Sequence, residues 1–350
     1  MLRGGFAQMI FQRSLLIDLL KIIGSHLIVL HHLVLYSPMA KIVESKLPRL
    51  IDFFFYYARL PVWSFFVVAG FLCAHIVDKR TSFNLLHAIG KRCLRLLPLY
   101  FISIFTVVLV TILFGPFIKD ELWISPIPSL IEFLSHLLLI QDVIGQPALS
   151  AGAWYVSIDL QLFALTLALF YLSRYFYTNF EIEMIGSCIF LASLVSLFIW
   201  SKEELFENYP IYFMNAYGLG LIAYLARKNK LCFLFFLLLL MAHVMDMVFD
   251  LSANSAVILL TAVTLYFVDK GYVITNRISK IIESASNSSY ALFVSHFFVI
   301  IIFTSIWNML ELKGFFVAFT MLIVTWLVTT LIGTALNFLY ARLAYLLPKF

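Results

Sequence analysis

Long apolar stretches recur along almost the whole 350-residue chain. A helix needs about 20 mostly apolar residues to cross the hydrocarbon core of a bilayer. Of the residues, 63% are hydrophobic and only 12% are charged, a composition typical of polytopic membrane proteins rather than soluble domains. The sequence therefore predicts an all-α integral membrane protein with about ten transmembrane helices. The predicted spans are about 14–37, 60–77, 98–117, 152–173, 185–200, 210–226, 231–248, 253–268, 289–308 and 315–340.

The loops between these stretches alternate in charge. Loops after the second, sixth and eighth stretches are basic, whereas those after the third, fifth and seventh are acidic or nearly so. Because Lys and Arg accumulate in short cytoplasmic loops, this pattern predicts that both termini are cytoplasmic. The basic first outer loop is an exception. Residues 129–140 are apolar on one face and too short to span, so we expect them to lie in the interface or to re-enter. A single transmembrane domain over 1–350 accounts for the chain.

Several classes of protein are excluded by what the sequence lacks. The net charge of +5 is no sign of a nucleic-acid partner, because the basic residues gather in short loops. HExxH, P-loop and GxSxG motifs do not occur, so a zinc protease, an NTPase and an α/β hydrolase have no local support. The four cysteines are scattered and form no CxxC pair. We therefore expect no metal and no disulfide framework.

The first apolar stretch carries polar groups that a simple membrane anchor would not keep. A charged side chain at the centre of a bilayer costs about 2.5–3.5 kcal/mol even on lenient scales. At about 100° per residue, Asp18, Lys21, Ser25 and His32 share one narrow helix face, and His31 points away from it. This stripe predicts a polar pathway inside the bundle. The alternative is that these groups only form hydrogen bonds with neighbouring helices.

A histidine and a carboxylate are expected at similar depth in two different spans. His32 lies about five residues from the outer end of the first span, and Asp159 about six residues below the outer start of the fourth. Such a pair can act as a general base, with the acid orienting the ring and stabilising its charged form. Lys21 is expected nearer the cytoplasm, as is His296, about seven residues into the ninth span.

The most basic segment of the chain, 78–98, supplies candidate phosphate ligands. Arg92 and Arg95 are three residues apart and share a helix face, with Lys91 beside them. Arginine matches phosphate bidentately. Contact with anionic lipid, or the topology rule alone, explains the same cluster equally well.

Five motifs in order resemble those of the family 3 membrane acyltransferases, the acyltransferase-3 or nose-resistant-to-fluoxetine-like superfamily. The first is the run with Asp18, Lys21 and, after ten further residues, His32. The others are VWSFFVVAGF at 62–71, KRCLRLLPLY at 91–100, AWYVSIDLQLF at 153–163 and SSYALFVSHF at 288–297. Together they cover nearly the whole chain and match the ten-span layout of the family. Two positions depart from the family pattern, since Ala69 replaces the usual Ser and Asp159 the commoner Glu.

The resemblance implies an O-acyltransferase, an enzyme that transfers groups other than amino-acyl groups. The acyl group, expected to be acetyl, would pass from cytoplasmic acyl-CoA to a hydroxyl of an extracytoplasmic carbohydrate, a lipid-linked glycan or a related cell-surface acceptor. In this interpretation His32 is the base, directly or through a covalent acyl relay, and Asp159 orients it. Lys21 and Asp18 would shape the donor channel or stabilise developing charge. Lys91, Arg92, Arg95 and His296 are the expected acyl-CoA ligands.

Four further residues are expected to bind substrate. Trp154 and Tyr155 lie at the predicted outer rim and could stack on a sugar, although aromatic residues gather at interfaces anyway. Ser157 is expected to contact the substrate, and Asp18 to shape its channel. The alternative function is a transporter or flippase that uses the same intramembrane Asp, Lys and His groups as its path. A bacterial inner (plasma) membrane, with its lipids as partners, fits either function.

Overall fold

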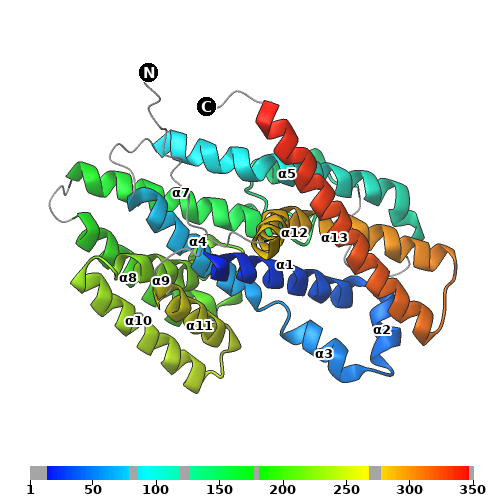
Figure 1. Ribbon diagram of the computed structural model, residues 1–350, viewed down its shortest axis with the longest axis horizontal. Coiled ribbons are helices and arrows are strands. Elements are labelled where there is room, and N and C mark those ends of the chain that lie inside the picture. The colour runs from blue at the N-terminus through cyan, green and yellow to red at the C-terminus, as the bar shows by residue number, and fades with distance from the viewer. Residues whose placement is uncertain (1–13, 79–84, 119–126, 177–180, 268–276, 347–350) are drawn as a thin grey trace.

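The computed structural model describes residues 14–78, 85–118, 127–176, 181–267 and 277–346 of the protein. Helices make up nearly all of this part of the chain, and it contains no strand. The predicted all-α fold is thus confirmed. Most long helices run along one common direction in Figure 1. The ends of the chain, and part of the basic segment 78–98, lie outside the described residues, so the predicted side of the termini stays a prediction.

Eight segments are long and apolar enough to cross a membrane. Each contains one of the long helices α1 (Leu15–Tyr36), α4 (Pro61–Asp78), α5 (Leu85–Phe114), α7 (Ala153–Phe176), α8 (Glu181–Phe198), α10 (Lys230–Phe249), α12 (Arg277–Met309) and α13 (Phe315–Leu346). The shorter helices of the described chain are α2 (Pro38–Glu44), α3 (Pro48–Tyr56), α6 (Leu130–Leu137), α9 (Met214–Leu225) and α11 (Ala253–Phe267).

Two of the ten predicted spans are short helices. The stretches 210–226 and 253–268 become α9, with 12 residues, and α11, with 15. At 1.5 Å per residue these helices are about 18 and 23 Å long, less than the hydrocarbon thickness of about 30 Å. Apolar composition alone could not distinguish them from full spans, because a helix buried in protein is as apolar as one that crosses lipid.

Helix α9 is buried along its whole length. All twelve of its residues are buried, and it packs chiefly against α4 and α8. A methyl group added to Gly70 of α4 would lie 1.9 Å from the Tyr217 carbonyl oxygen, and one added to Gly220 would lie 1.9 Å from that of Val67. The backbones of α4 and α9 therefore touch, as they do where small residues line the contact of membrane helices.

Two of the long helices begin well before the predicted spans. Helix α5 starts at Leu85 instead of 98, and α12 starts at Arg277 instead of 289. With 30 residues, α5 is about 45 Å long and exceeds the hydrocarbon core by several turns. The polar residues that hydropathy assigned to loops are therefore the first turns of these two helices.

The segment that follows α5 folds back against the bundle. Ser129 caps α6 in a capping box with Glu132, and the next helix starts only at Ala153. His136, Gln141 and Leu149 are buried in this connection, whereas Leu130 and Leu138 are exposed. The prediction that 129–140 does not span is consistent with an α6 of eight residues.

Candidate active site

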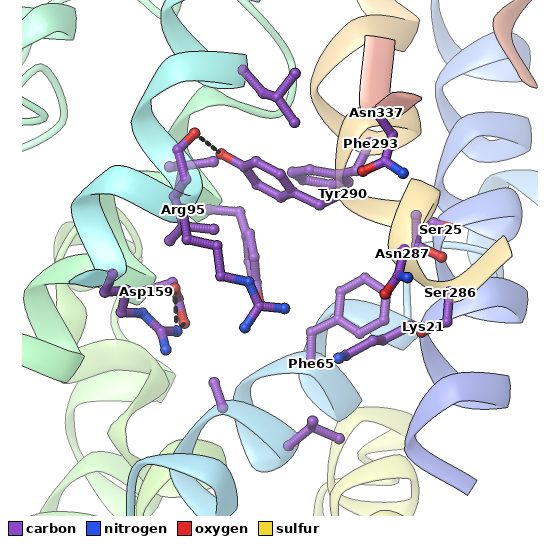
Figure 2. Close-up of a pocket in the computed structure, with 18 of the residues that line it drawn as sticks. Lys21, Ser25, Phe65, Arg95, Asp159, Ser286, Asn287, Tyr290, Phe293 and Asn337 are labelled. Carbon is purple, nitrogen blue, oxygen red and sulfur yellow. Dashed lines mark hydrogen bonds and ion pairs between the residues drawn. The ribbon is translucent and has the colours of Figure 1, made fainter. Parts of the chain in front are cut away.

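A central cavity of about 360 Å³ lies among six helices, α1, α4, α5, α7, α12 and α13. Figure 2 shows the polar side chains that face it. Five of the residues singled out from the sequence line it, namely Lys21, Arg92, Arg95, Tyr155 and Asp159. Its other polar lining residues are Ser25, Ser286, Asn287, Ser289, Tyr290, Asn337 and Tyr340. The fold thus brings residues that are up to 320 positions apart in the chain to one enclosed space.

An ion pair forms one wall of the central cavity. One terminal nitrogen of Arg92 donates to both carboxylate oxygens of Asp159, at 2.7 and 2.6 Å. The Asp159 side chain is only 5% exposed, and the guanidinium carbon of Arg92 lies 4.4 Å from the centre of the Phe163 ring. Because a buried charge needs a counter-charge, the two side chains compensate each other in this wall.

This ion pair corrects the predicted pairing of His32 with Asp159. Both carboxylate oxygens accept from Arg92, and no hydrogen bond joins Asp159 to His32 in the described part of the chain. Arg92 belongs to the first third of α5, so Asp159 lies at the level of the basic helix start. The depth estimate was wrong because it placed the start of α7 at the outer surface, whereas the chain folds back before that helix begins.

Arg95 and Lys21 face each other across the cavity. In Figure 2 the Arg95 guanidinium and the Lys21 ammonium point into the same space from α5 and α1. Lys91, by contrast, is exposed and does not line the cavity. Among the described residues that line the cavity, two arginines and a lysine face one carboxylate, that of Asp159, so the formal charges of this lining sum to a positive value.

His32 and His296 form a stacked pair beside the cavity. Their ring centres are 4.7 Å apart and their planes differ by 11°. The Nδ1 atom of His296 contacts the Phe293 carbonyl oxygen, which can only accept, so Nδ1 carries the proton and Nε2 has a free lone pair. That Nε2 and the Nδ1 of His32 are both buried without a hydrogen-bond partner.

The contact between these rings corrects the predicted level of His296. Counting from residue 289 put it near the cytoplasm, well below His32, but α12 has already run 19 residues when it reaches His296. The Phe293 ring connects the pair to the cavity, because it contacts Tyr155 at 5.4 Å and His296 at 6.0 Å. Phe293 itself lines the cavity, so one aromatic layer separates the histidines from it.

Three residues that were expected to bind substrate do not border the cavity. Trp154 packs against Phe66 and Phe213. Ser157 is fully buried and accepts a hydrogen bond from Gln141 at 2.6 Å. Asp18 is 6% exposed and accepts from Ser286 at 2.6 Å.

His31 lies apart from the cavity, as its place on the first helix predicts. Its Nδ1 lies 3.2 Å from the Phe54 carbonyl oxygen, although its ring also approaches His32 with 5.2 Å between centres.

Sequence reasoning missed the polar residues that α12 and α13 contribute. Ser286, Asn287 and Tyr290 lie in the early turns of α12, and Asn337 lies late in α13. A helical pattern extended backwards from 289 would have placed Asn287 and Tyr290 on one face. Within the described ranges, no group of three or more His, Cys, Asp or Glu side chains is arranged to hold a metal ion.

One comparison with known proteins identifies the family. The sequence model of the family described as an acyltransferase domain matches residues 15–342. No curated protein and no solved structure matches the chain. The family match extends from the first residue of α1 to the last turns of α13 and includes every residue of the central cavity. The chain belongs to the acyltransferase-3 family.

Proposed function

We propose that this membrane acyltransferase moves an acyl group, acetyl in the simplest case, from cytoplasmic acyl-CoA to a hydroxyl outside the cytoplasm. The acceptor would be a carbohydrate or a lipid-linked glycan of the cell surface, and the membrane a bacterial inner membrane. The observation that supports this proposal is the positively charged central cavity next to a histidine pair with unpartnered nitrogens. An anionic donor and a hydroxyl to be deprotonated are the ligands that such an arrangement suits.

The donor would enter by the end of the cavity where α5 begins. Arg95 presents a guanidinium whose planar fork suits a phosphate or pyrophosphate group. Arg92 already neutralises Asp159, so its share in phosphate binding would be smaller than the sequence implied. Lys91 is exposed on the same helix and would meet the charged end of the donor at the entrance.

The reaction would need one base and one group that stabilises negative charge. A neutral His32 would take the proton of the acceptor hydroxyl as its oxygen attacks the thioester carbonyl carbon. Tyr155, whose ring contacts Phe293 next to the histidine pair, would stabilise the resulting oxyanion through its hydroxyl. Lys21 lies about 16 Å from His32 along α1 and would instead bind the charged part of the donor. The carbon–sulfur bond then breaks, and the CoA thiolate takes the proton back from the imidazolium. In a two-step variant His32 itself carries the acyl group between donor and acceptor.

His32→Ala tests the proposed base. It should lower acyl transfer by about 10²–10⁴-fold while the purified protein keeps its thermal stability. The measurement is CoA release from acetyl-CoA by protein in proteoliposomes, with mass spectrometry of the glycan acceptor. His31→Ala is the matched control, since it removes a neighbouring ring that is bound to the Phe54 carbonyl. Normal turnover by His32→Ala, or CoA-independent, gradient-driven movement of substrate, would contradict the proposal.

Arg95→Ala tests the donor site. It should raise the apparent KM for acetyl-CoA at least tenfold with little change in that for the acceptor, and Arg95→Lys should recover only part of the loss. Lys230→Ala removes an exposed cation at the start of α10, away from the cavity, and should leave both KM values unchanged. If Arg95→Ala and Lys230→Ala change the KM for acetyl-CoA equally, Arg95 serves in lipid contact or in membrane topology rather than in donor binding.

A further inference from the structure

A second cavity, of about 200 Å³, lies near the start of α4. It is bounded by Trp63 near the start of α4, by the segments that follow α8 and α10, and by the start of α11. On the predicted topology these four ends all face outside the cytoplasm. On the same measure a single water needs only about 10–15 Å³, so this cavity holds far more than one ordered water.

Charged side chains are fixed along one side of this second cavity. Lys202 forms ion pairs with the buried Asp246 and, at 2.6 Å, with the exposed Asp250. Asp246 also accepts a hydrogen bond from Ser255 at 2.5 Å. One cation thus faces two carboxylates, and the cavity carries net negative charge. Its chemistry is therefore the opposite of that of the central cavity.

The hydrogen-bond directions in this cluster leave lone pairs unused. Because Ser255 donates to Asp246, its oxygen must accept from the Nδ1–H of His243, 2.9 Å away. The Nε2 of His243 is then left with a lone pair and no hydrogen-bond partner, but His243 is not among the residues that line the cavity. The Oδ1 of Asn215 is likewise buried and unpartnered, and Asn215 lines the cavity with only 2% of its surface exposed.

The unpartnered Oδ1 of Asn215 indicates what kind of ligand would fit. It is an acceptor, and a buried acceptor without a partner costs about 1–3 kcal/mol, so the site favours a ligand that donates hydrogen bonds. Trp63 and Tyr212 line the same cavity and supply apolar ring surface. A sugar offers hydroxyl donors around its edge and C–H groups on its face, which matches this combination of acceptors and aromatic rings.

We propose that the second cavity binds one sugar residue of the acceptor glycan. This inference rests on the proposed function for its biological meaning, but the binding it predicts needs no acyl-CoA. The site would anchor the acceptor at the outer end of α4, away from the donor. A continuous layer of aromatic rings, Trp63, Phe213, Trp154 and Tyr155, runs from this site to the central cavity, with neighbouring ring centres 5.3, 5.4 and 6.2 Å apart.

Saturation-transfer NMR on the full-length protein in detergent tests the inference directly. The probes are the methyl glycosides of glucose, galactose, mannose and N-acetylglucosamine, with ethanolamine as a cationic competitor for the carboxylates. At least one glycoside should show saturable binding without acyl-CoA. Asn215→Ala should weaken that binding at least tenfold. Should this variant fail to fold, the exposed Asp250→Asn replaces it, with a several-fold loss expected.

Glu204→Gln is the control, an exposed charge on the same connection that does not line the cavity. The inference is overturned if none of the glycosides binds, if ethanolamine binds in their place, or if the cavity variants bind as tightly as the unchanged protein. Glycoside binding without any acyl transfer would contradict the enzymatic proposal alone. Acyl transfer with an acceptor KM unaffected by Asn215→Ala would contradict only the second site.

Discussion

Two buried polar centres lie near the central cavity, and they differ in charge compensation. In the Arg92–Asp159 pair the two carboxylate oxygens both accept from the guanidinium, so the charges cancel, although the Nε of Arg92 is buried without a hydrogen-bond partner. In the His32–His296 pair two ring nitrogens lie buried and unpartnered. A charge cannot remain in such a place without a counter-charge, but a neutral ring can, at a cost of about 1–3 kcal/mol.

This difference suggests two roles. The ion pair holds the site together, and the histidine pair is available for the reaction. The ion pair joins α5 to α7 and fixes the wall of the cavity. The histidine pair joins α1 to α12 by ring stacking and leaves lone pairs unused. An unsatisfied buried group in a native structure calls for a functional explanation, and base chemistry is the explanation that suits imidazole. Three predictions test the comparison, in order of decreasing effect.

Asp159→Asn should destabilise the protein strongly, because it leaves the Arg92 charge buried without compensation. We expect the free energy of unfolding to fall by about 3–5 kcal/mol, measured by denaturation in detergent. A double variant, Arg92→Met with Asp159→Leu, removes both charges and should recover most of the loss. An Asp159→Asn protein as stable as the unchanged one would show that the ion pair does not hold the wall.

His296→Phe should have the opposite signature, with lower activity and little change in stability. A ring remains to stack on His32, and the variant loses both the Nδ1 hydrogen bond to the Phe293 carbonyl and the unpartnered Nε2. These two effects oppose each other, so the free energy of unfolding should stay within about 1 kcal/mol of its original value. Acyl transfer should fall at least tenfold if the second imidazole assists the first. Thermal unfolding and CoA release measure the two effects on one preparation.

His136→Phe is the matched control for that experiment. This histidine is also fully buried, but Nδ1 is bound to the Glu132 carbonyl at 2.8 Å and Nε2 accepts from the Leu149 N–H at 3.0 Å. Its replacement by Phe leaves the Glu132 carbonyl and the Leu149 N–H without these hydrogen bonds, which should lower the free energy of unfolding by about 1–3 kcal/mol. If His136→Phe and His296→Phe destabilise equally, the His296 nitrogen is not free.

Asp142 provides the smallest effect, because this carboxyl has no ion pair among the described residues. Burial raises its pKa from 3.8 to about 6, although its own backbone N–H and the Gln141 amide, at 2.7 Å, both donate to it. Between about pH 4 and 6 the folded protein therefore holds a proton that the unfolded chain has released. Stability should fall as the pH rises through this window, by about 1 kcal/mol because the group is partly hydrated.

Asp142→Asn removes this titration and should flatten the dependence. Melting temperatures at pH 4.5 and 7 measure it, with the gain in the variant expected at pH 7. Asn keeps an oxygen that can still accept from Gln141. A variant whose melting temperature keeps the same pH dependence would assign the effect to another group.

The fold class and most of the cavity could be predicted because they depend on local patterns. Long apolar runs define membrane helices. The family motifs contain Lys21, Arg92, Arg95 and Asp159, and all four line the central cavity. Which of these side chains touch one another could not be predicted in the same way. Depth counted along a span assumes that each helix starts at a membrane surface, and α5 and α12 break this assumption.

The contacts that could not be predicted from the sequence share one physical reason. Hydropathy treats the first turns of α5 and α12 as loop because they are polar, yet these turns are helical and line the site. The segment after α6 shifts the start of α7 inwards, which moves Asp159 to Arg92 and away from His32. Tertiary packing of irregular segments leaves no periodic trace in a single sequence.

The burial of α9 has a consequence for how the protein is made. This helix, about 18 Å long, has no residue on the lipid-facing surface, and its closest partner is α4, synthesised some 140 residues earlier. As it leaves the ribosome it is too short to span the bilayer alone, and its ends would leave polar backbone in hydrocarbon. We therefore expect α9 to take its place only after α4 and α8 are positioned. Biogenesis of this bundle would then depend on the close backbone approach of α4 and α9 at Gly70 and Gly220.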